Sequence, residues 1–162
     1  MTAQTLLRLV IDTREQAPFE FRNYPCEAGP GTLPAGDYSV KGMETLVAVE
    51  RKSLPDLVQC LGRERSRFEA ELLRLRGYAF ACVVVEANLS DLIHGGYRSK
   101  LDPHAALQSI LAFQARTRVP FIWCDTRPQA EMVTFWQLQK VLREIQSRYE
   151  RIVKAHGPLV AA

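Results

Sequence analysis

The sequence lacks a long hydrophobic run and any closely spaced pair of cysteines. No apolar stretch approaches the ~20 residues that a helix needs to cross a bilayer, and no basic segment followed by a long apolar stretch marks a secretory signal. The four cysteines, Cys26, Cys60, Cys82 and Cys124, lie far apart in the chain. This spacing argues against a zinc site and against a disulfide framework. We therefore expect a cytoplasmic protein with no membrane partner.

The chain also lacks a strong excess of either charge. Its 162 residues carry a formal net charge of +3, and the isoelectric point is near 8.8. Such a mild surplus does not by itself indicate a nucleic-acid partner, so the placement of the arginines matters more. A composition of 47% hydrophobic and 24% charged residues is typical of a globular protein. The length suits one domain, and we expect residues 1–162 to form it.

Periodicity and turn residues predict an α/β fold, in which helices flank a mixed central sheet. Short apolar runs indicate buried strands, and a turn joins two of them into a hairpin. Residues 17–35 are rich in proline and glycine, so we expect a loop there. The predicted strands cover residues 6–12, 37–40, 45–52, 78–86 and 120–124. A short helix is predicted directly after Ser53, and three further helices are predicted over 65–76, 103–116 and 128–155.

Carboxylates and a lysine are grouped around the predicted hairpin. Side chains alternate along a strand, so Glu50 and Lys52 point to one face and Arg51 to the other. Asp37 begins the paired strand and Asp56 lies in the following helix, so both can approach Glu50. Cleavage of a phosphodiester requires activated water and neutralised phosphate charge, and a Mg²⁺ or Mn²⁺ ion held by a few acids supplies both. A nearby lysine can orient water or stabilise developing charge.

A structural alternative exists for this group of residues. Glu50 and Lys52 can form a surface ion pair while Asp56 only caps a helix, and a lone Glu-x-Lys triplet arises often by chance. However, Gly36-Asp37 and the run Asp12-Thr13-Arg14-Glu15, at the end of the first predicted strand, add further acids. The combination favours a metal-dependent active site over a chance cluster.

These residues resemble the nuclease domain of XPF-type structure-specific endonucleases. The signature of that family is GD, a variable gap, ERK, a short spacer and D. Here it is filled by Gly36-Asp37, Glu50-Arg51-Lys52 and Asp56, and the resemblance extends to the run that begins at Asp12. The motif core covers about 6–90, and the resemblance fades after about Glu86.

The resemblance implies a restriction-endonuclease-like core and a role for each residue of the motif. Arg51 and Asp56 would hold the motif together or contact DNA, while Lys52 would be the catalytic lysine. The implied metal ligands are Asp37, Glu50, Asp12 and the backbone carbonyl of Arg51. The implied catalytic residues are Asp37, Glu50, Lys52, Asp12 and Glu15, and the supporting residues are Arg14, Arg51 and Asp56.

One feature of that family is missing from this sequence. Its members usually carry tandem helix-hairpin-helix domains that grip duplex DNA, and we find no such domain here. The chain resembles a stand-alone nuclease domain of the kind expected in bacteria or phages. The resemblance also favours a homodimer through the nuclease domain. In the last predicted helix, the neighbouring aromatics Phe135 and Trp136 are candidates for its surface, although both can equally pack internally.

Arginines around the predicted helix 65–76 suit contact with phosphate. Arg63, Arg67 and Arg74 fall on one flank of this helix, and the planar fork of arginine meets phosphate oxygens in pairs. Such contacts would position DNA without reading its sequence. The alternative is a solvated face whose arginines pair with glutamates of the same helix.

A second basic segment follows Gly95-Gly96. Its members Tyr97, Arg98 and Lys100 combine an aromatic ring with two cations. Such a loop can contact a DNA backbone or stack on an unpaired base. An ordinary surface loop is the alternative interpretation, and the sequence does not separate the two.

Together these patterns predict a Mg²⁺- or Mn²⁺-dependent DNA endonuclease. It would hydrolyse phosphodiester bonds in branched, flap, junction or duplex DNA during repair or recombination. The rival hypothesis is a non-catalytic DNA-binding scaffold subunit with the same fold. A scaffold of that kind should have lost acids from the motif, and this chain retains all of them.

Overall fold

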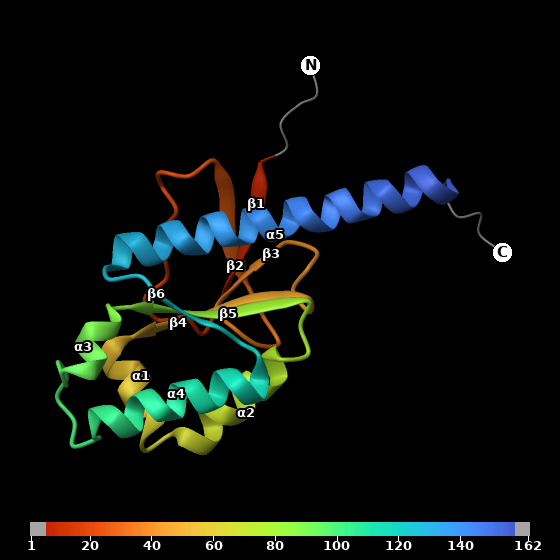
Figure 1. Cartoon of the computed structure of the whole chain (residues 1–162). Coiled ribbons are helices and arrows are strands. Elements are labelled where there is room, and N and C mark those ends of the chain that lie inside the picture. The colour runs from red at the N-terminus through yellow and green to blue at the C-terminus, as the bar shows by residue number, and fades with distance from the viewer. Residues whose placement is uncertain (1–5, 158–162) are drawn as a thin grey trace.

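The computed structural model describes residues 6–157, so the predicted domain 1–162 extends beyond the described residues at both ends. Within the described range the chain forms one six-stranded sheet with helices on both faces (Figure 1). The strands are β1 (Leu7–Asp12), β2 (Cys26–Gly31), β3 (Tyr38–Val40), β4 (Val47–Ser53), β5 (Phe80–Glu86) and β6 (Phe121–Trp123). The helices are α1 (Leu54–Leu61), α2 (Arg65–Leu75), α3 (Leu89–Ile93), α4 (Pro103–Thr117) and α5 (Arg127–His156).

The sheet is mixed, as predicted, and its strand order is β2-β1-β3-β4-β5-β6. Only β3 opposes the others: it is antiparallel to β1 and to β4, while β2, β5 and β6 pair in parallel with their neighbours. As a result, the carboxyl ends of β1, β4 and β5 lie at the same end of the sheet, which is also where β3 begins. Asp12, Asp37, Lys52 and Glu86 therefore meet at one edge, although the sequence separates them widely. The carboxyl ends of parallel strands are the usual place for a site in such sheets.

The prediction of a continuous loop over 17–35 is wrong, because β2 lies within it. Along its whole length β2 pairs in parallel with β1, from Leu7 opposite Cys26 to Asp12 opposite Gly31. The segment reads CEAGPG, and its glycines and proline gave turn signals that concealed the strand. Proline is tolerated here because β2 is an edge strand, which leaves one row of backbone groups unpaired.

The short helix α3 was not predicted from the sequence either. It begins with a capping box, in which the Asn88 side chain accepts from the N–H of Asp91 (2.9 Å) and the Asp91 side chain accepts from the N–H of Asn88 (3.1 Å). A helix of 5 residues is too short to show a helical period in its sequence. The other predicted helices and strands are confirmed, with ends that shift by a few residues.

Two hydrophobic layers enclose the sheet, with α1, α2 and α4 on one face and α5 on the other (Figure 1). Alternation along β4 places Ala48 in the first layer and Val49 in the second. Continued along the strand, the same alternation sends Glu50 and Lys52 to the face of α1 and α2, and Arg51 to the face of α5. The hydrophobic pattern thus fixes which side of β4 carries each polar residue of the motif.

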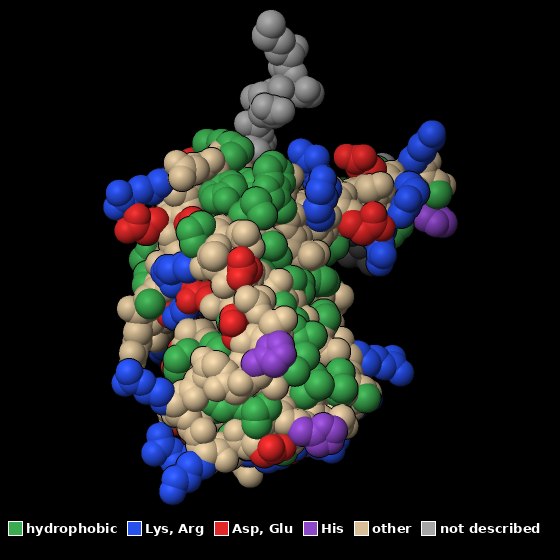
Figure 2. Space-filling model, turned by 60° about the vertical axis from the view of Figure 1, so that its left-hand side comes forward, with side chains coloured by type: hydrophobic (Ala, Val, Ile, Leu, Met, Phe, Trp, Pro, Cys, Tyr) green, Lys and Arg blue, Asp and Glu red, His purple; other side chains and the backbone are tan. Residues whose placement is uncertain are grey.

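The long helix α5 crosses the second face and continues past the sheet (Figure 1). Phe135 is buried and stacks on Tyr24 with ring centroids 4.6 Å apart, whereas the neighbouring Trp136 is 44% exposed. The projecting end of α5 carries basic and acidic side chains side by side (Figure 2). None of the helices between residues 6 and 157 is both long and apolar enough for a membrane span.

Candidate active site

A polar cavity of about 400 Å³ opens at the edge where β1, β4 and β5 end. Asp37, Glu50 and Lys52 line it from the sheet, and Asp56 and Arg67 line it from α1 and α2. A smaller hollow of about 230 Å³ adjoins it and shares Asp37, Glu50 and Lys52. The structure therefore brings together the residues that the sequence grouped around the hairpin.

Gly36 sets the position of Asp37. Its φ of +79° lies in the region that favours glycine, and a Cβ there would lie 2.8 Å from the Cβ of Ala48. The backbone N–H of Asp37 donates to the carbonyl of Val49 (2.9 Å), and its carbonyl accepts from the N–H of Asp12 (2.8 Å). Asp37 is thus held between β1 and β4, where its side chain reaches the end of β4.

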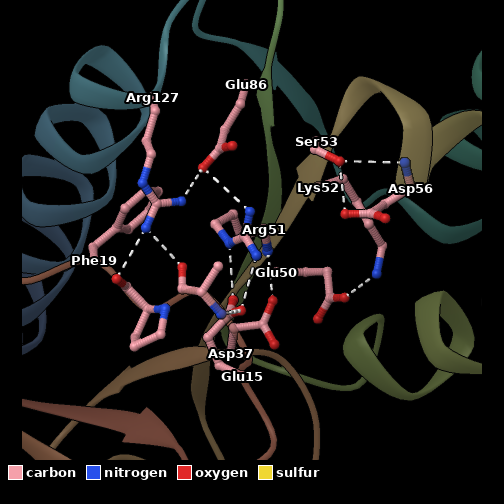
Figure 3. Close-up of polar contacts among 12 residues, drawn as sticks. Glu15, Phe19, Asp37, Glu50, Arg51, Lys52, Ser53, Asp56, Glu86 and Arg127 are labelled. Atoms are coloured by element: carbon pink, nitrogen blue, oxygen red, sulfur yellow. Dashed lines mark hydrogen bonds and ion pairs between the residues drawn. The ribbon is translucent and has the colours of Figure 1, made fainter.

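Asp37 and Glu50 point into the cavity as a pair of carboxylates (Figure 3). Oδ2 of Asp37 accepts from the N–H of Arg51 (2.8 Å), and Oε1 of Glu50 forms an ion pair with Nζ of Lys52. Among residues 6–157, no group donates a hydrogen bond to Oδ1 of Asp37 or Oε2 of Glu50. Each carboxylate therefore offers one oxygen to a ligand. The Lys52 ammonium also lies 5.4 Å from the ring centroid of Phe68, which confines it from the side of α2.

Burial dominates the electrostatics of this pair. Burial raises the pKa of Asp37 to about 6, and nearby glutamates add to the rise. Burial likewise raises the pKa of Glu50 well above its usual value, and the charge of Asp37 adds to it. Burial alone would lower the pKa of Lys52, but the Glu50 carboxylate outweighs it and the pKa is raised. Paired groups with strongly shifted pKa values in a cleft are typical of a functional site.

Arg51 occupies the opposite side of β4 and organises a buried ionic network (Figure 3). Its Nε and Nη2 donate to the two carboxylate oxygens of Glu15 at 2.9 and 2.8 Å. Its Nη1 donates to Glu86 at 3.2 Å, and the same Glu86 oxygen accepts from Arg127 at 2.8 Å. Burial would raise the pKa of Glu15, but the hydrogen bonds from Arg51 lower it below its usual value. Glu15 thus supports Arg51, and it also lines the cavity beside Asp37.

Glu86 and Arg127 also belong to this network, and neither was predicted from the sequence. Glu86 ends the apolar strand β5 just as Asp12 ends β1, and that shared pattern was a usable signal. Arg127 gave no such signal, because it contacts residues that are distant in the chain. Its Nη2 donates to the carbonyls of Ala17 (2.7 Å) and Pro18 (2.9 Å), so it fastens the loop after β1 to the start of α5.

Asp12 lies beside the pair, but its oxygens are already engaged. Oδ1 accepts from Nε (2.7 Å) and the backbone N–H (2.9 Å) of Arg14, and Oδ2 accepts from the N–H of Leu33 (2.7 Å). Burial would raise the pKa of Asp12, but the hydrogen bonds from Arg14 and Leu33 bring it below its usual value. Its geometry is that of a support for the segment that leads to Gly36.

Asp56 lines the cavity from the first turn of α1. Its side chain accepts from the Ser53 hydroxyl (2.6 Å), and its N–H donates to that hydroxyl (3.3 Å). Ser53 is therefore the N-cap of α1, and Asp56 supports this cap from the first turn of the helix.

The basic residues divide between two surfaces. Arg67 and Arg74 of α2 border the active-site hollow, and Arg67 also pairs with Glu64. Arg63 lies in the turn before α2 and lines a different groove together with Tyr97 and Arg98. The expectation that Arg63 shares a flank with Arg67 and Arg74 is therefore wrong, because it precedes the helix. Lys100 is exposed near the second groove and does not line it.

The carboxylate pair suits a hard divalent cation. In the described part of the chain, no three Asp, Glu, His or Cys side chains converge into a ready-made metal cage. Mg²⁺ is usually held by one or two carboxylates, with waters and substrate phosphates completing its shell. Asp37 and Glu50, each with a free oxygen, therefore fit an ion that is shared with a phosphate substrate.

Comparisons with known proteins agree with this geometry. A family model described as the ERCC4 domain matches residues 11–134. The chain belongs to the ERCC4 domain family. This confirms the resemblance that the motif indicated, and the family match includes the carboxylate pair, Lys52, Arg51 and Glu15. Comparison with curated protein sequences gives no match.

Solved structures confirm the restriction-endonuclease-like fold of this ERCC4 domain. XPF from Aeropyrum pernix superposes with a TM-score of 0.65 at 21% identity, covering 83% of this chain and 60% of that chain. XPF from Aeropyrum pernix in complex with DNA gives a TM-score of 0.64 at 19% identity, covering 85% of this chain and 66% of that chain. The chain thus spans about 60% of the first of these structures.

Proposed function

We propose that this ERCC4-domain protein is a metal-dependent DNA endonuclease that hydrolyses phosphodiester bonds. The observation that carries the proposal is the pair Asp37 and Glu50 beside Lys52. Glu50 is buried and Asp37 half-buried, and among residues 6–157 no group donates a hydrogen bond to one oxygen of each. The similar XPF structure that was determined in complex with DNA supports DNA as the substrate.

In this proposal Asp37 and Glu50 hold a Mg²⁺ or Mn²⁺ ion, together with the backbone carbonyl of Arg51. Such an ion supplies a lowered pKa for water and neutralises phosphate charge. Asp12 and Glu15 act as supports: Asp12 orders the segment before Gly36, and Glu15 orients Arg51. Asp12 as a direct ligand remains a prediction, and it would require exchange of its present hydrogen bonds.

Lys52 acts on the substrate side of the pair. Its ammonium is anchored by Glu50 and confined against Phe68, so it is positioned before substrate binds. It would orient the attacking water and stabilise the charge that develops on phosphate. Arg67 and Arg74, at the rim of the hollow, would position the backbone of the DNA. The products would carry a 5′-phosphate and a 3′-hydroxyl, as the family resemblance implies.

The finer parts of the proposal concern substrate and setting. We propose branched, flap or junction DNA as the substrate, with a role in repair or recombination. A homodimer through the nuclease domain also remains a prediction, for which the exposed Trp136 and Met132 on α5 are candidate contacts. A reducing cytoplasmic location is supported by the four cysteines, all of which are free thiols.

The decisive experiment is cleavage of labelled DNA by the purified protein. Single strand, duplex, 3′ flap, splayed arm and nicked junction would be compared with Mg²⁺, Mn²⁺ or EDTA. Asp37→Asn and Glu50→Gln should each abolish cutting while the variant protein stays folded. The matched control is Glu27→Gln, an exposed acid on the edge strand β2. Activity in either site variant comparable to that of the parent would refute the site.

The rival function, a non-catalytic DNA-binding scaffold, makes a different prediction. A scaffold would bind DNA without cutting it under any metal, and Asp37→Asn would leave its affinity in EDTA unchanged. The retained carboxylate pair favours the enzyme, since a scaffold has no use for two acids whose pKa values are raised by burial and by neighbouring carboxylates.

A further inference from the structure

A second groove of about 690 Å³ runs beside the active-site cavity, along helix α1. Pro55, Val58 and Gly62 line this groove, whereas Asp56 and Cys60 line the cavity. At about 100° per residue these two sets form adjacent stripes of the same helix. Gln59 lies between the stripes and lines both hollows. One helix therefore separates the groove from the cavity.

The groove combines cations with an aromatic ring. Arg63 from the α1–α2 turn and Arg98 from the segment after α3 are exposed and line it. Within residues 6–157 neither arginine forms an ion pair, and no acidic side chain lines the groove. Lys and Arg side chains also gather along the lower left edge of the molecule in Figure 2. The described side chains that line the groove would therefore not repel a chain of negative charges.

Tyr97 gives the groove a fixed platform. It is half-buried against the core beneath α1 and α4, and its hydroxyl donates to the carbonyl of Leu101 (2.9 Å). The ring is therefore held in one orientation while it lines the groove. Pro55, which is exposed, supplies an apolar surface in the same groove. A fixed ring and flanking arginines are the elements with which proteins bind single-stranded nucleic acid.

The occupant that fits these features is a single strand of DNA. Its phosphates match Arg63 and Arg98, and its unstacked bases can lie on Tyr97. A duplex would satisfy the arginines but not the ring, because its bases are already stacked. We infer that this groove holds the unpaired strand of a forked DNA whose other strand lies in the active-site cavity, with α1 between the two strands. The inference rests on the proposed function and deepens it: the unpaired strand would lie against Arg63, Tyr97 and Arg98, across α1 from the carboxylate pair.

The test is binding of the full chain, in EDTA, to a blunt duplex and to the same duplex with a splayed arm, followed by fluorescence anisotropy. The parent should bind the fork more tightly than the duplex. Tyr97→Ala should weaken fork binding by about tenfold, while Tyr97→Phe, which keeps the ring, should not. Arg98→Ala should weaken fork binding and lower its salt slope by about 0.7, as expected for one contact to a single strand.

The matched control is Arg143→Ala, which removes an exposed arginine of α5 on the other face of the sheet. It should leave binding of both DNAs unchanged. Because Tyr97 packs on the core, folding of Tyr97→Ala would be checked by circular dichroism, and Arg98→Ala, at an exposed position, carries the test if that variant unfolds.

Two outcomes would overturn the inference. If Tyr97→Ala and Arg98→Ala weaken the binding of duplex and fork equally, or weaken the binding of neither DNA, the groove does not hold an unpaired strand. Metal-dependent cutting that is lost in Glu50→Gln would leave the proposed nuclease intact in that case. If neither DNA binds and neither is cut, the inference and the proposed function fail together.

Discussion

Replacing Asp37 by asparagine should stabilise the metal-free protein while abolishing its activity. Asp37 and Glu50 are held close together in a largely buried site, where Lys52 forms the ion pair with Glu50. Asparagine keeps the shape of the side chain and an oxygen that can accept the N–H of Arg51. It removes one of two repelling charges, and Glu50 and Lys52 remain as a balanced pair. The folded protein would then no longer be destabilised by two neighbouring carboxylates, an arrangement that function explains and stability does not.

The magnitude follows from the pKa of Asp37. A rise from 3.8 to about 6 corresponds to about 3 kcal/mol for the ionised form relative to the protonated form. Some of this is relieved by relaxation around a coupled pair, so we expect a gain on the order of 1–3 kcal/mol at pH 8. For a chain of this length that corresponds to a rise in Tm of about 2–10 °C.

The sign of the pH dependence is fixed by the same pKa. Because the folded-state pKa of Asp37 lies above its unfolded value, the folded protein binds the proton more tightly. This contribution to stability is therefore fully present below pH ~4 and is lost as pH rises through about 6. Asp37→Asn should flatten this part of the profile, so that its advantage over the parent grows between pH 4 and pH 7.

Glu50→Gln provides an internal comparison. It also removes one of the repelling carboxylates, but it leaves the buried Lys52 without its ion-pair partner. Loss of one partner from a buried pair costs several kcal/mol in measured cases. We therefore expect Glu50→Gln to stabilise the protein less than Asp37→Asn, or to destabilise it.

The assay is thermal unfolding in EDTA and in Mg²⁺, from pH 4 to pH 8. The parent should gain stability with Mg²⁺, because an ion that binds only the folded state raises Tm. Asp37→Asn should lose most of that gain. A lower Tm for Asp37→Asn than for the parent in EDTA at pH 8 would refute the argument. So would a parent whose Tm does not respond to either divalent ion.

Further predictions concern the supports of the site. Lys52→Met should reduce cleavage at least about a hundredfold while the Mg²⁺-dependent rise in Tm persists; loss of both would mean that Lys52 mainly shapes the metal site. Arg51→Met should lower the free energy of unfolding by about 3–5 kcal/mol in denaturant unfolding, because it leaves Glu15 and Glu86 buried without this partner. The control Arg8→Ala, which breaks an exposed pair with Glu27, should cost less than about 1 kcal/mol. Equal losses in the two variants would contradict the proposed role of the network. Gly36→Ala should destabilise more than Gly42→Ala, since both positions have positive φ but only Gly36 has Ala48 at 2.8 Å; equal destabilisation would show that Ala48 moves aside freely.

The local pattern of the chain was sufficient to predict the site pair. Alternation along 45–52 separated Glu50 and Lys52 from Arg51, and the Gly36-Asp37 turn placed the second acid at the start of the partner strand. Both predictions depend only on strand geometry and on a residue that tolerates positive φ. The helices and the mixed sheet were predictable for the same reason, because apolar periods are local.

Features that depend on long-range contacts were not predictable from that pattern. Arg127 joins Glu86, a residue 41 positions earlier, and no periodicity records such a pairing. β2 lies at the sheet edge, where pairing with β1 compensates for glycine and proline that disfavour a strand. Arg63 was assigned to the wrong surface because helical phase was extended into a turn. The errors on Arg127 and β2 come from contacts that tertiary structure makes and local propensity does not encode, whereas the error on Arg63 comes from the position of a helix start.

The triplet Glu50-Arg51-Lys52 can be understood as a unit of strand geometry. Because side chains alternate, an acid and a base two residues apart face the cavity, and the arginine between them must face the other layer. There the Arg51 guanidinium donates hydrogen bonds to Glu15 and Glu86, while its backbone N–H donates to the Asp37 carboxylate. One residue thus fixes the loop after β1, the strand β5 and the second carboxylate at once. Moving the register of β4 by a single residue would exchange the two faces, bury the network in the cavity and remove Glu50 and Lys52 from it.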